Sequence, residues 1–522
     1  MRVLLVEPNY RRGKPSSSKK INDDTLWYPP IGLLKLSRFH KNRNDDVVFT
    51  IGKNSELFSQ PSLFSEVKGR GLFDRVYITT LFTFDFDKVI EVINYYRNAI
   101  GGTRGKIFIG GVMASLMPEE IFNDTGIFPI PGILTSPAQI GLPGKENIDQ
   151  LCPDYSILDK STYAINNTFY AYTTRGCTNA CPWCGVPKIE PEFEPYIDIK
   201  PIITQLREEV GDLAVLKLMD NNVLASPKLE QIVGDLLGLG YGRGSTTDSH
   251  PPRSRVIDFN QGLDASHLNE DNIKLLSKLN IKPMRIAFDK LAEKAVYKKA
   301  IESAYKYGFT EFSNYMLFNF KDTPKDLYER LVINIKLNAK WRRGTPSQPP
   351  GSIYSYPMRY APIIDPAKNG ENKKRDPQYL NQEAQSRDWL KSPIWTPRFV
   401  RNVEIMKGAA HGAITPSPTL AWRTIGETFS EFIANLYMPE ELIRNRNRHE
   451  KKVYSGEPER NPGTGLVEDF REFILKLLNE KNNLFFTFHD TIIPNRTDLI
   501  KKAIENNTDK ELNFWFQQYL RK

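Results

Sequence analysis

Short apolar runs alternate with helical stretches along the first 360 residues, and this alternation constrains the fold more than any other feature of the sequence. Runs of this kind have the composition of buried strands, while residues 86–98 have the spacing of an amphipathic helix. Strands that alternate with helices favour a parallel sheet with helices on both faces. We therefore expect residues 1–150 to form an α/β, Rossmann-like domain in which Gly110 and Gly111 close the fourth strand. Its strands are expected at 2–7, 47–51, 75–79 and 106–109.

A second series of strands and helices begins near residue 165. Six strand–helix units in a row predict a partial (β/α)6 barrel over residues 165–364, with its site at the carboxyl ends of the strands. Its strands are expected at 169–173, 215–219, 256–260, 284–288, 313–317 and 353–356. After a polar, proline-containing stretch at 365–397, the pattern makes residues 365–522 a mainly helical region. Its helices are expected at 398–410, 425–446, 465–480 and 498–520.

The composition excludes a disordered chain and a fibrous repeat, because 40% of the residues are hydrophobic and 25% are charged. The apolar runs are too short to cross a membrane, and no secretory signal precedes the first strand. We expect a cytoplasmic protein without a membrane partner. The net charge of +9 permits contact with phosphates, and a basic run contains Arg444, Arg446 and Arg448.

Three of the four cysteines, Cys177, Cys181 and Cys184, lie within eight residues in a loop that follows a predicted strand. A structural zinc site needs a fourth ligand, which usually comes from a second pair of cysteines or histidines, and the sequence has no such pair. Three thiolates suit a [4Fe–4S] cluster whose fourth iron binds an external ligand. Cys152 is left over, and we expect it to be a packed apolar thiol.

The spacing Cys-x3-Cys-x2-Cys, with Trp183 directly before the third cysteine, resembles the signature of the radical S-adenosylmethionine superfamily. The segments 28–33, 152–156 and 173–176 are similar to those of members that carry an N-terminal cobalamin-binding-type domain. The resemblance implies that the three clustered cysteines ligate a [4Fe–4S] cluster, and that S-adenosylmethionine chelates its open iron. It also implies that one electron, from a donor such as flavodoxin or ferredoxin, cleaves the sulfonium to a 5′-deoxyadenosyl radical, which abstracts hydrogen from an unidentified substrate.

The same resemblance places the S-adenosylmethionine site at the polar ends of the barrel strands. The second strand offers a carboxylate, Asp220, for the methionyl amine, and the fourth offers Arg285 for the methionyl carboxylate. The third strand supplies groups for the carboxylate or ribose, and the fifth resembles a segment that contacts adenine. Each residue also has a plain structural explanation in a turn or salt bridge, and none is singled out as catalytic. The predicted cofactor-binding residues are Asp220, Asn221, Asn222, Asn260, Gln261, Asp264, Arg285, Asp289 and Asn319.

One departure and two alternatives accompany this interpretation. Members that bind cobalamin carry Asp-x-His-x-x-Gly after the first strand, whereas Glu7 to Gly13 contains no histidine and His40 is the domain's only one. Cobalamin is therefore disfavoured. One alternative is an enzyme that modifies nucleic acid, held by the basic C-terminal helices. The other is a non-catalytic iron–sulfur binding or regulatory protein.

Overall fold

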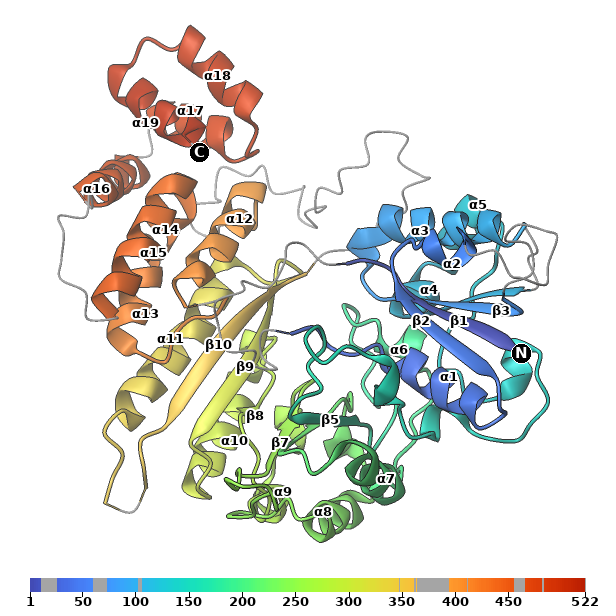
Figure 1. Ribbon diagram of the computed structural model, residues 1–522. Helices are drawn as coiled ribbons and strands as arrows, with labels where there is room; N and C mark the ends of the chain where they lie inside the picture. The colour runs from blue at the N-terminus through green and yellow to red at the C-terminus, as the bar shows by residue number, and fades with distance from the viewer. Residues whose placement is uncertain are drawn as a thin grey trace. The chain divides into compact units, whose positions relative to one another are not determined.

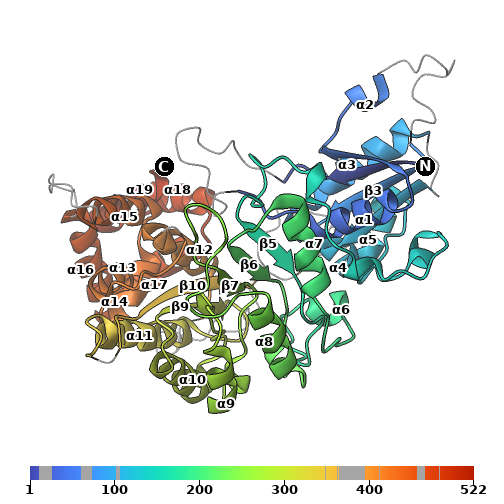
Figure 2. The same ribbon diagram turned by 60° about the horizontal axis from the view of Figure 1, so that its bottom comes forward.

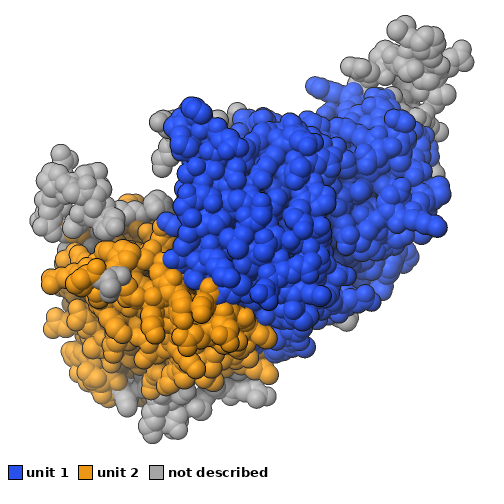
Figure 3. All heavy atoms as spheres, turned by 90° about the horizontal axis from the view of Figure 1, so that it is seen from below, with its two compact units in different colours: residues 1–261, 275–282, 363–375 blue, residues 262–274, 283–362, 376–522 orange. Residues whose placement is uncertain are grey.

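The protein has an α/β fold built on parallel sheets (Figure 1). The chain divides into two compact units, coloured separately in Figure 3: the first is 1–261, 275–282 and 363–375, and the second is 262–274, 283–362 and 376–522. The first unit thus combines the predicted N-terminal domain with the first three strands of the predicted second domain. The computed structural model describes residues 1–10, 26–59, 73–101, 106–346, 348–360, 363, 394–410, 412–454, 465–480 and 483–521.

The N-terminal sheet is parallel and has the strand order β2-β1-β3-β4. Its strands are β1 (Arg2–Glu7), β2 (Asp46–Ile51), β3 (Arg75–Thr80) and β4 (Ile107–Gly111). All four lie where the sequence predicts them. They could be recognised because strands buried on both faces consist of nearly continuous apolar residues.

Helices cover both faces of this sheet, as alternating side chains of β1 show. Leu4 and Val6 pack in a core with α3, α4 and α5, whereas Val3 and Leu5 pack in a second core with α1. The sheet is therefore a three-layer, doubly wound structure. The covering helices are α1 (Ile31–Lys41), α3 (Phe86–Ala99), α4 (Val112–Leu116) and α5 (Pro118–Thr125).

Each unit also contains a three-stranded parallel sheet in which the strands follow sequence order. The first unit has β5 (Thr168–Ala171), β6 (Val215–Leu218) and β7 (Val256–Phe259). The second has β8 (Met284–Arg285), β9 (Glu311–Phe318) and β10 (Ser352–Arg359). Helices accompany the strands, and α7 packs against β5 (Figure 2). The described residues pair these strands into two sheets, so closure into one barrel is not confirmed. The helices between the strands include α7 (Lys200–Val210), α8 (Leu229–Gly238), α10 (Lys294–Lys306) and α11 (Pro324–Trp341).

The described part of the C-terminal region is helical, as predicted, but two predicted helices are wrong in length. Residues 425–446 contain two helices separated at Pro439, which has no N–H to continue a helix. Residues 498–520 also contain two, because Asp509 caps the second through the Leu512 amide. The helices α13 and α17 were not predicted, and most of the stretch 365–397 lies outside the described residues. The helices are α12 (Pro397–Met406), α13 (Pro418–Ile425), α14 (Phe429–Tyr437), α15 (Glu440–Tyr454), α16 (Gly465–Glu480), α17 (Asn483–Ile492), α18 (Thr497–Asn506) and α19 (Lys510–Leu520).

Within the described ranges, no helix combines the length and the apolar composition that crossing a membrane requires.

The end of β4 generates a prediction about stability. Gly111 has φ 111° and ψ −169°, and a Cβ there would lie 2.2 Å from the Thr80 carbonyl oxygen. Gly111→Ala should lower the free energy of unfolding by at least the strain of this backbone conformation, about 1–3 kcal/mol. Gly234→Ala, inside α8 with open space around the new Cβ, is the control and should stabilise by about 0.5–1 kcal/mol. Urea denaturation followed by circular dichroism measures the stability of both variants. Wild-type stability in Gly111→Ala would contradict the strained backbone conformation at this position.

Candidate cofactor site

The three clustered cysteines lie on an excursion between β5 and α7, here called the cysteine loop, residues 173–190. Its start is paired with a following segment, because Arg175 and Glu194 exchange two backbone hydrogen bonds of 3.0 Å each. The Ile197 amide also donates to the Thr173 carbonyl at 2.7 Å. The loop includes the short helix α6 (Val186–Ile189). The protein backbone therefore holds the entry to the loop without any bound group.

The side chain of Asp220, directly beyond β6, fixes the start of the cysteine loop. One of its oxygens, Oδ1, accepts hydrogen bonds of 2.5–2.8 Å from the amides and hydroxyls of both Thr173 and Thr174. The side chain is buried. The sequence places Asp220 correctly at the end of its strand, but it does not show these four hydrogen bonds.

Two side-chain oxygens at this strand end have no hydrogen-bond partner among the described residues. Asp220 Oδ2 and Asn222 Oδ1 are both buried and accept no hydrogen bond from the described protein groups. Burial raises the pKa of Asp220, and its hydrogen bonds with Thr173 and Thr174 oppose that shift. A buried acceptor without a donor is unfavourable, so these two oxygens suit a ligand that carries N–H groups and positive charge.

Several N–H groups are directed at the cysteine sulfurs. The Asn179 amide donates to Cys177 Sγ at 3.3 Å, and the Asn222 side-chain amide reaches the same sulfur at 3.5 Å. The Val186 amide lies 3.5 Å from Cys184 Sγ. Such donors stabilise thiolates and tune the potential of a cluster that they ligate. The donor set is thus chemically suited to an iron–sulfur cluster.

The thiols of the cysteine loop are accessible but are not drawn together. Cys177 and Cys181 are half-buried, and Cys184 is exposed. Among the residues that the structure describes, no three His, Cys, Asp or Glu side chains are close enough to hold a metal ion. The cluster assignment therefore depends on the number, type and spacing of the thiols, and it stays a prediction.

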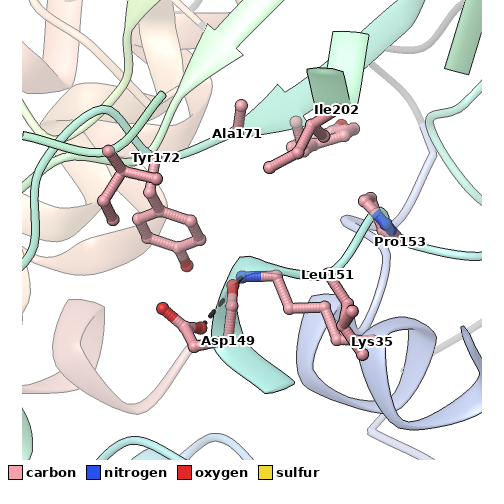
Figure 4. A pocket seen from close by; sticks show the side chains of 9 residues that line it. Lys35, Asp149, Leu151, Pro153, Ala171, Tyr172 and Ile202 are labelled. Atoms are coloured by element: carbon pink, nitrogen blue, oxygen red, sulfur yellow. Dashed lines mark hydrogen bonds and ion pairs between the residues drawn. The ribbon is translucent and has the colours of Figure 1, made fainter. Parts of the chain in front are cut away.

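A small cavity lies beside the cysteine loop, between α1 and β5. Its volume is about 10 Å³, enough for one water molecule, and its walls include Lys35, Asp149 and Tyr172 (Figure 4). A cofactor the size of S-adenosylmethionine does not fit there. The cavity belongs to the packing behind the loop and is not a binding site for a nucleoside.

Two of the three remaining predicted residues of the first unit, Asn221 and Asn260, have protein partners. Asn221 donates to Glu190 at 2.8 Å, and Asn260 accepts a hydrogen bond of 2.9 Å from the Tyr28 hydroxyl. Gln261 is exposed. Tyr28 is part of the N-terminal segment with the family resemblance, and its contact with Asn260 was not predicted.

The four predicted residues of the second unit are also engaged within that unit. The hydrogen bonds join Asp264 to the Ser266 amide, Arg285 to Ser313 and Tyr315, Asp289 to the Leu317 amide, and Asn319 to the Tyr360 carbonyl. Asn319 has φ 67°, the left-handed conformation that asparagine tolerates better than most residues. Their structural explanations are therefore supported, and their roles as cofactor ligands stay predictions.

Sequence reasoning missed Arg330, which organises the strand ends of the second unit. This residue of α11 is fully buried and donates to the carbonyls of Phe288, Asp289 and Leu317. It also forms an ion pair of 3.0 Å with Asp322. The only signal in the sequence is a cation on the apolar face of a helix, which rarely occurs without a buried partner.

His40 and the basic run both have structural roles. His40 is buried, with Nδ1 2.7 Å from Asp45 and Nε2 3.0 Å from the Tyr77 hydroxyl, so neither nitrogen is open to cobalt. In the basic run of α15, Arg446 is buried against Asn435, while the two outer arginines pair with Glu440 and Glu441. The run therefore gives little support to a phosphate-binding surface.

Comparison with known proteins adds no family to this geometry. No family model matches the chain, and no curated protein is significantly similar to it. The function is therefore inferred from the residues of the site.

Cys152 provides a test of the cysteine assignments. Burial raises its pKa to about 11, so about one thiol in a thousand is ionised at pH 8. Iodoacetamide at pH 8 should alkylate the three thiols of the cysteine loop in metal-free protein and leave Cys152 unmodified. Peptide mass mapping measures the rates, and urea-denatured protein is the control in which all four react. Alkylation of native Cys152 at the rate of the loop thiols would contradict its buried position.

Proposed function

We propose that this chain is a radical S-adenosylmethionine enzyme that abstracts hydrogen from an unidentified substrate. The observation that carries the proposal is that Asn222 contacts the sulfur of Cys177 while its own carbonyl oxygen, and Oδ2 of Asp220, are buried without donors from the described protein groups. A three-thiol loop and a buried anionic acceptor thus share one strand end. A ligand with N–H groups and positive charge suits these acceptors, and the methionyl amine and sulfonium of S-adenosylmethionine supply both.

The cysteines and the polar residues beyond β6 have separate roles in this proposal. Cys177, Cys181 and Cys184 would hold the cluster, and Asp220 and Asn222 would accept hydrogen bonds from the N–H groups of the methionyl amine. When bound, the cluster supplies the single electron that breaks a carbon–sulfur bond of the sulfonium. The carboxylate of Asp220 is buried, and a hydrogen bond to a buried charged group is stronger than the same contact in solvent. Its Oδ1 contacts with the threonines keep the carboxylate in one orientation.

The two three-stranded sheets form one partial (β/α)6 barrel in this proposal. All their pairs are parallel, and the strands within each sheet follow sequence order, from β5 to β7 and from β8 to β10. Consecutive parallel strands joined by helices usually belong to one sheet. Arg285 then serves the methionyl carboxylate, and a small electron-transfer protein of the cytoplasm supplies the electron.

The cluster proposal predicts the metal content. Protein reconstituted anaerobically with iron and sulfide should bind about four irons per chain. Replacing Cys177, Cys181 and Cys184 together by alanine should abolish binding, whereas Cys152→Ala, the matched control, should not. Iron analysis with absorption spectroscopy measures this. Stoichiometric zinc without iron–sulfur absorption in the wild type would overturn the proposal.

The assignment of Asp220 to the methionyl amine predicts a change in cofactor affinity. Asp220→Asn keeps an oxygen for Thr173 and Thr174 but removes the charge, which is worth on the order of 1.5–3 kcal/mol or about ten- to hundredfold in affinity. The variant should keep its iron and form 5′-deoxyadenosine slowly unless S-adenosylmethionine is raised in proportion. Asp235→Asn removes a carboxylate that pairs with Lys200 and should match the wild type. Unchanged affinity in Asp220→Asn would refute the assignment of this carboxylate.

A further inference from the structure

Four buried charges connect the N-terminal sheet domain to the cysteine loop. Lys35 comes from α1, Asp149 from the segment that follows the sheet, and Arg175 and Glu190 from the two ends of the loop. All four belong to the first unit, and their side chains are 8–11% exposed. We call this set the charge chain.

The contacts within the charge chain run without a gap from α1 to the loop. Lys35 Nζ lies 2.9 Å from Asp149 Oδ1, a pair that Figure 4 shows. Arg175 binds the same carboxylate with two groups, Nε at 2.8 Å and Nη2 at 2.5 Å. Its remaining terminal nitrogen, Nη1, donates to Glu190 at 2.9 Å. The planar guanidinium thus joins two carboxylates in one fixed geometry.

Glu190 connects Arg175 to Gly176, the residue directly before the first cysteine. Its Oε2 accepts hydrogen bonds from the Gly176 amide at 2.6 Å and from Asn221 at 2.8 Å. Gly176 has φ 73°, and a Cβ there would lie 2.3 Å from the Glu192 carbonyl oxygen. The backbone that leads into Cys177 is therefore confined on both sides.

Packing removes the remaining freedom of Arg175. Its guanidinium lies 3.3 Å from the centre of the Tyr172 ring.

At the other end of the loop, Gly185 lies so close to Leu116 of α4 that an added Cβ would be 3.2 Å from that side chain. Two helices of the N-terminal sheet domain thus contact the loop, α4 directly and α1 through the charge chain.

The charge chain is better explained by positioning than by stability. It contains two cations and two carboxylates, so its formal charge is balanced. Buried ion pairs of this kind can often be replaced by apolar side chains without loss of stability. What apolar side chains do not supply is a set of directed hydrogen bonds, and these converge on the entry to the cysteine loop.

We propose that Arg175 is a positioning residue of the cysteine loop, and that the charge chain sets the position and the local charge of that loop from α1. The effect on the loop stands on the contacts above, whereas the effect on a cluster rests on the proposed function. Removal of Lys35 leaves one uncompensated negative charge in the charge chain. Negative charge near a cluster makes its reduction less favourable, so the midpoint potential should shift to lower values.

Hydrogen exchange of the metal-free full-length protein tests the loop directly. Peptides that cover residues 173–186 should exchange at least tenfold faster in Arg175→Gln than in the wild type, and Arg175→Lys should not restore protection because an ammonium lacks the bidentate geometry. The matched control is Arg255→Gln, which removes a buried arginine paired with Asp212 at 2.6 Å. Its loop should exchange at the wild-type rate. Wild-type exchange in Arg175→Gln, or equal acceleration in the control, would overturn the proposal.

Lys35→Met covers the case in which Arg175→Gln fails to fold, because it leaves both partners of Arg175 in place. Reconstituted and reduced Lys35→Met should show altered g-values in its electron paramagnetic resonance spectrum and a lower midpoint potential, with unchanged iron content. Spectrum and potential equal to those of the wild type would overturn the link from α1. A wild-type protein that binds no cluster would instead refute the proposed function, and the exchange experiment would still decide the role of Arg175.

Discussion

The carboxylate of Asp220 fixes the relation between two neighbouring strands and the cysteine loop. Four donors from Thr173 and Thr174 converge on one oxygen, so the chain leaving β5 is held against the end of β6. A buried carboxylate is stable there because these hydrogen bonds offset part of its desolvation. The second oxygen retains its capacity to accept, and this division of roles connects the fold with the proposed binding of S-adenosylmethionine.

Each unit uses buried polar groups to fix its strand ends. In the second unit, Arg330 donates hydrogen bonds to carbonyls of β9 and of the chain beyond β8. In the first unit, Asp220 and the charge chain hold the strand ends. Hydrogen bonds to buried charged groups are directional and are unfavourable to break, because a lone buried charge remains. Parallel strands end without a tight turn, so their exits depend on such contacts. The polar residues beyond the strands therefore hold the structure whether or not they also hold a ligand.

Local patterns made much of the fold predictable. The strands of the N-terminal sheet were found because each is an apolar run, and Asp220 was placed at a strand end for the same reason. Apolar spacing continues through Pro439 and Asp509, so it predicts helices at 425–446 and 498–520 that are longer than the observed ones. Proline and a capping residue mark these two helix boundaries in the sequence.

The supports of the candidate site could not be predicted in the same way. The cysteine spacing is a local pattern, and its eight residues are enough to indicate a cluster. Lys35 and Asp149, by contrast, are distant from Arg175 in the sequence. An ion pair between distant residues leaves no periodic signal in a single sequence, since any lysine can pair with any aspartate. The hydrogen bond from Tyr28 to Asn260 is of the same kind. What sequence reasoning supplied was the donor set, and the structure added the contacts that position it.

The most direct measurement is electron paramagnetic resonance of the reduced, iron-loaded protein with and without S-adenosylmethionine. If S-adenosylmethionine binds the open iron through its methionyl amine, the spectrum should change on addition of S-adenosylmethionine. The methionyl group labelled with 15N should then give a hyperfine coupling in electron–nuclear double resonance. A cluster spectrum that saturating S-adenosylmethionine leaves unchanged, without nitrogen coupling, would contradict the proposed function.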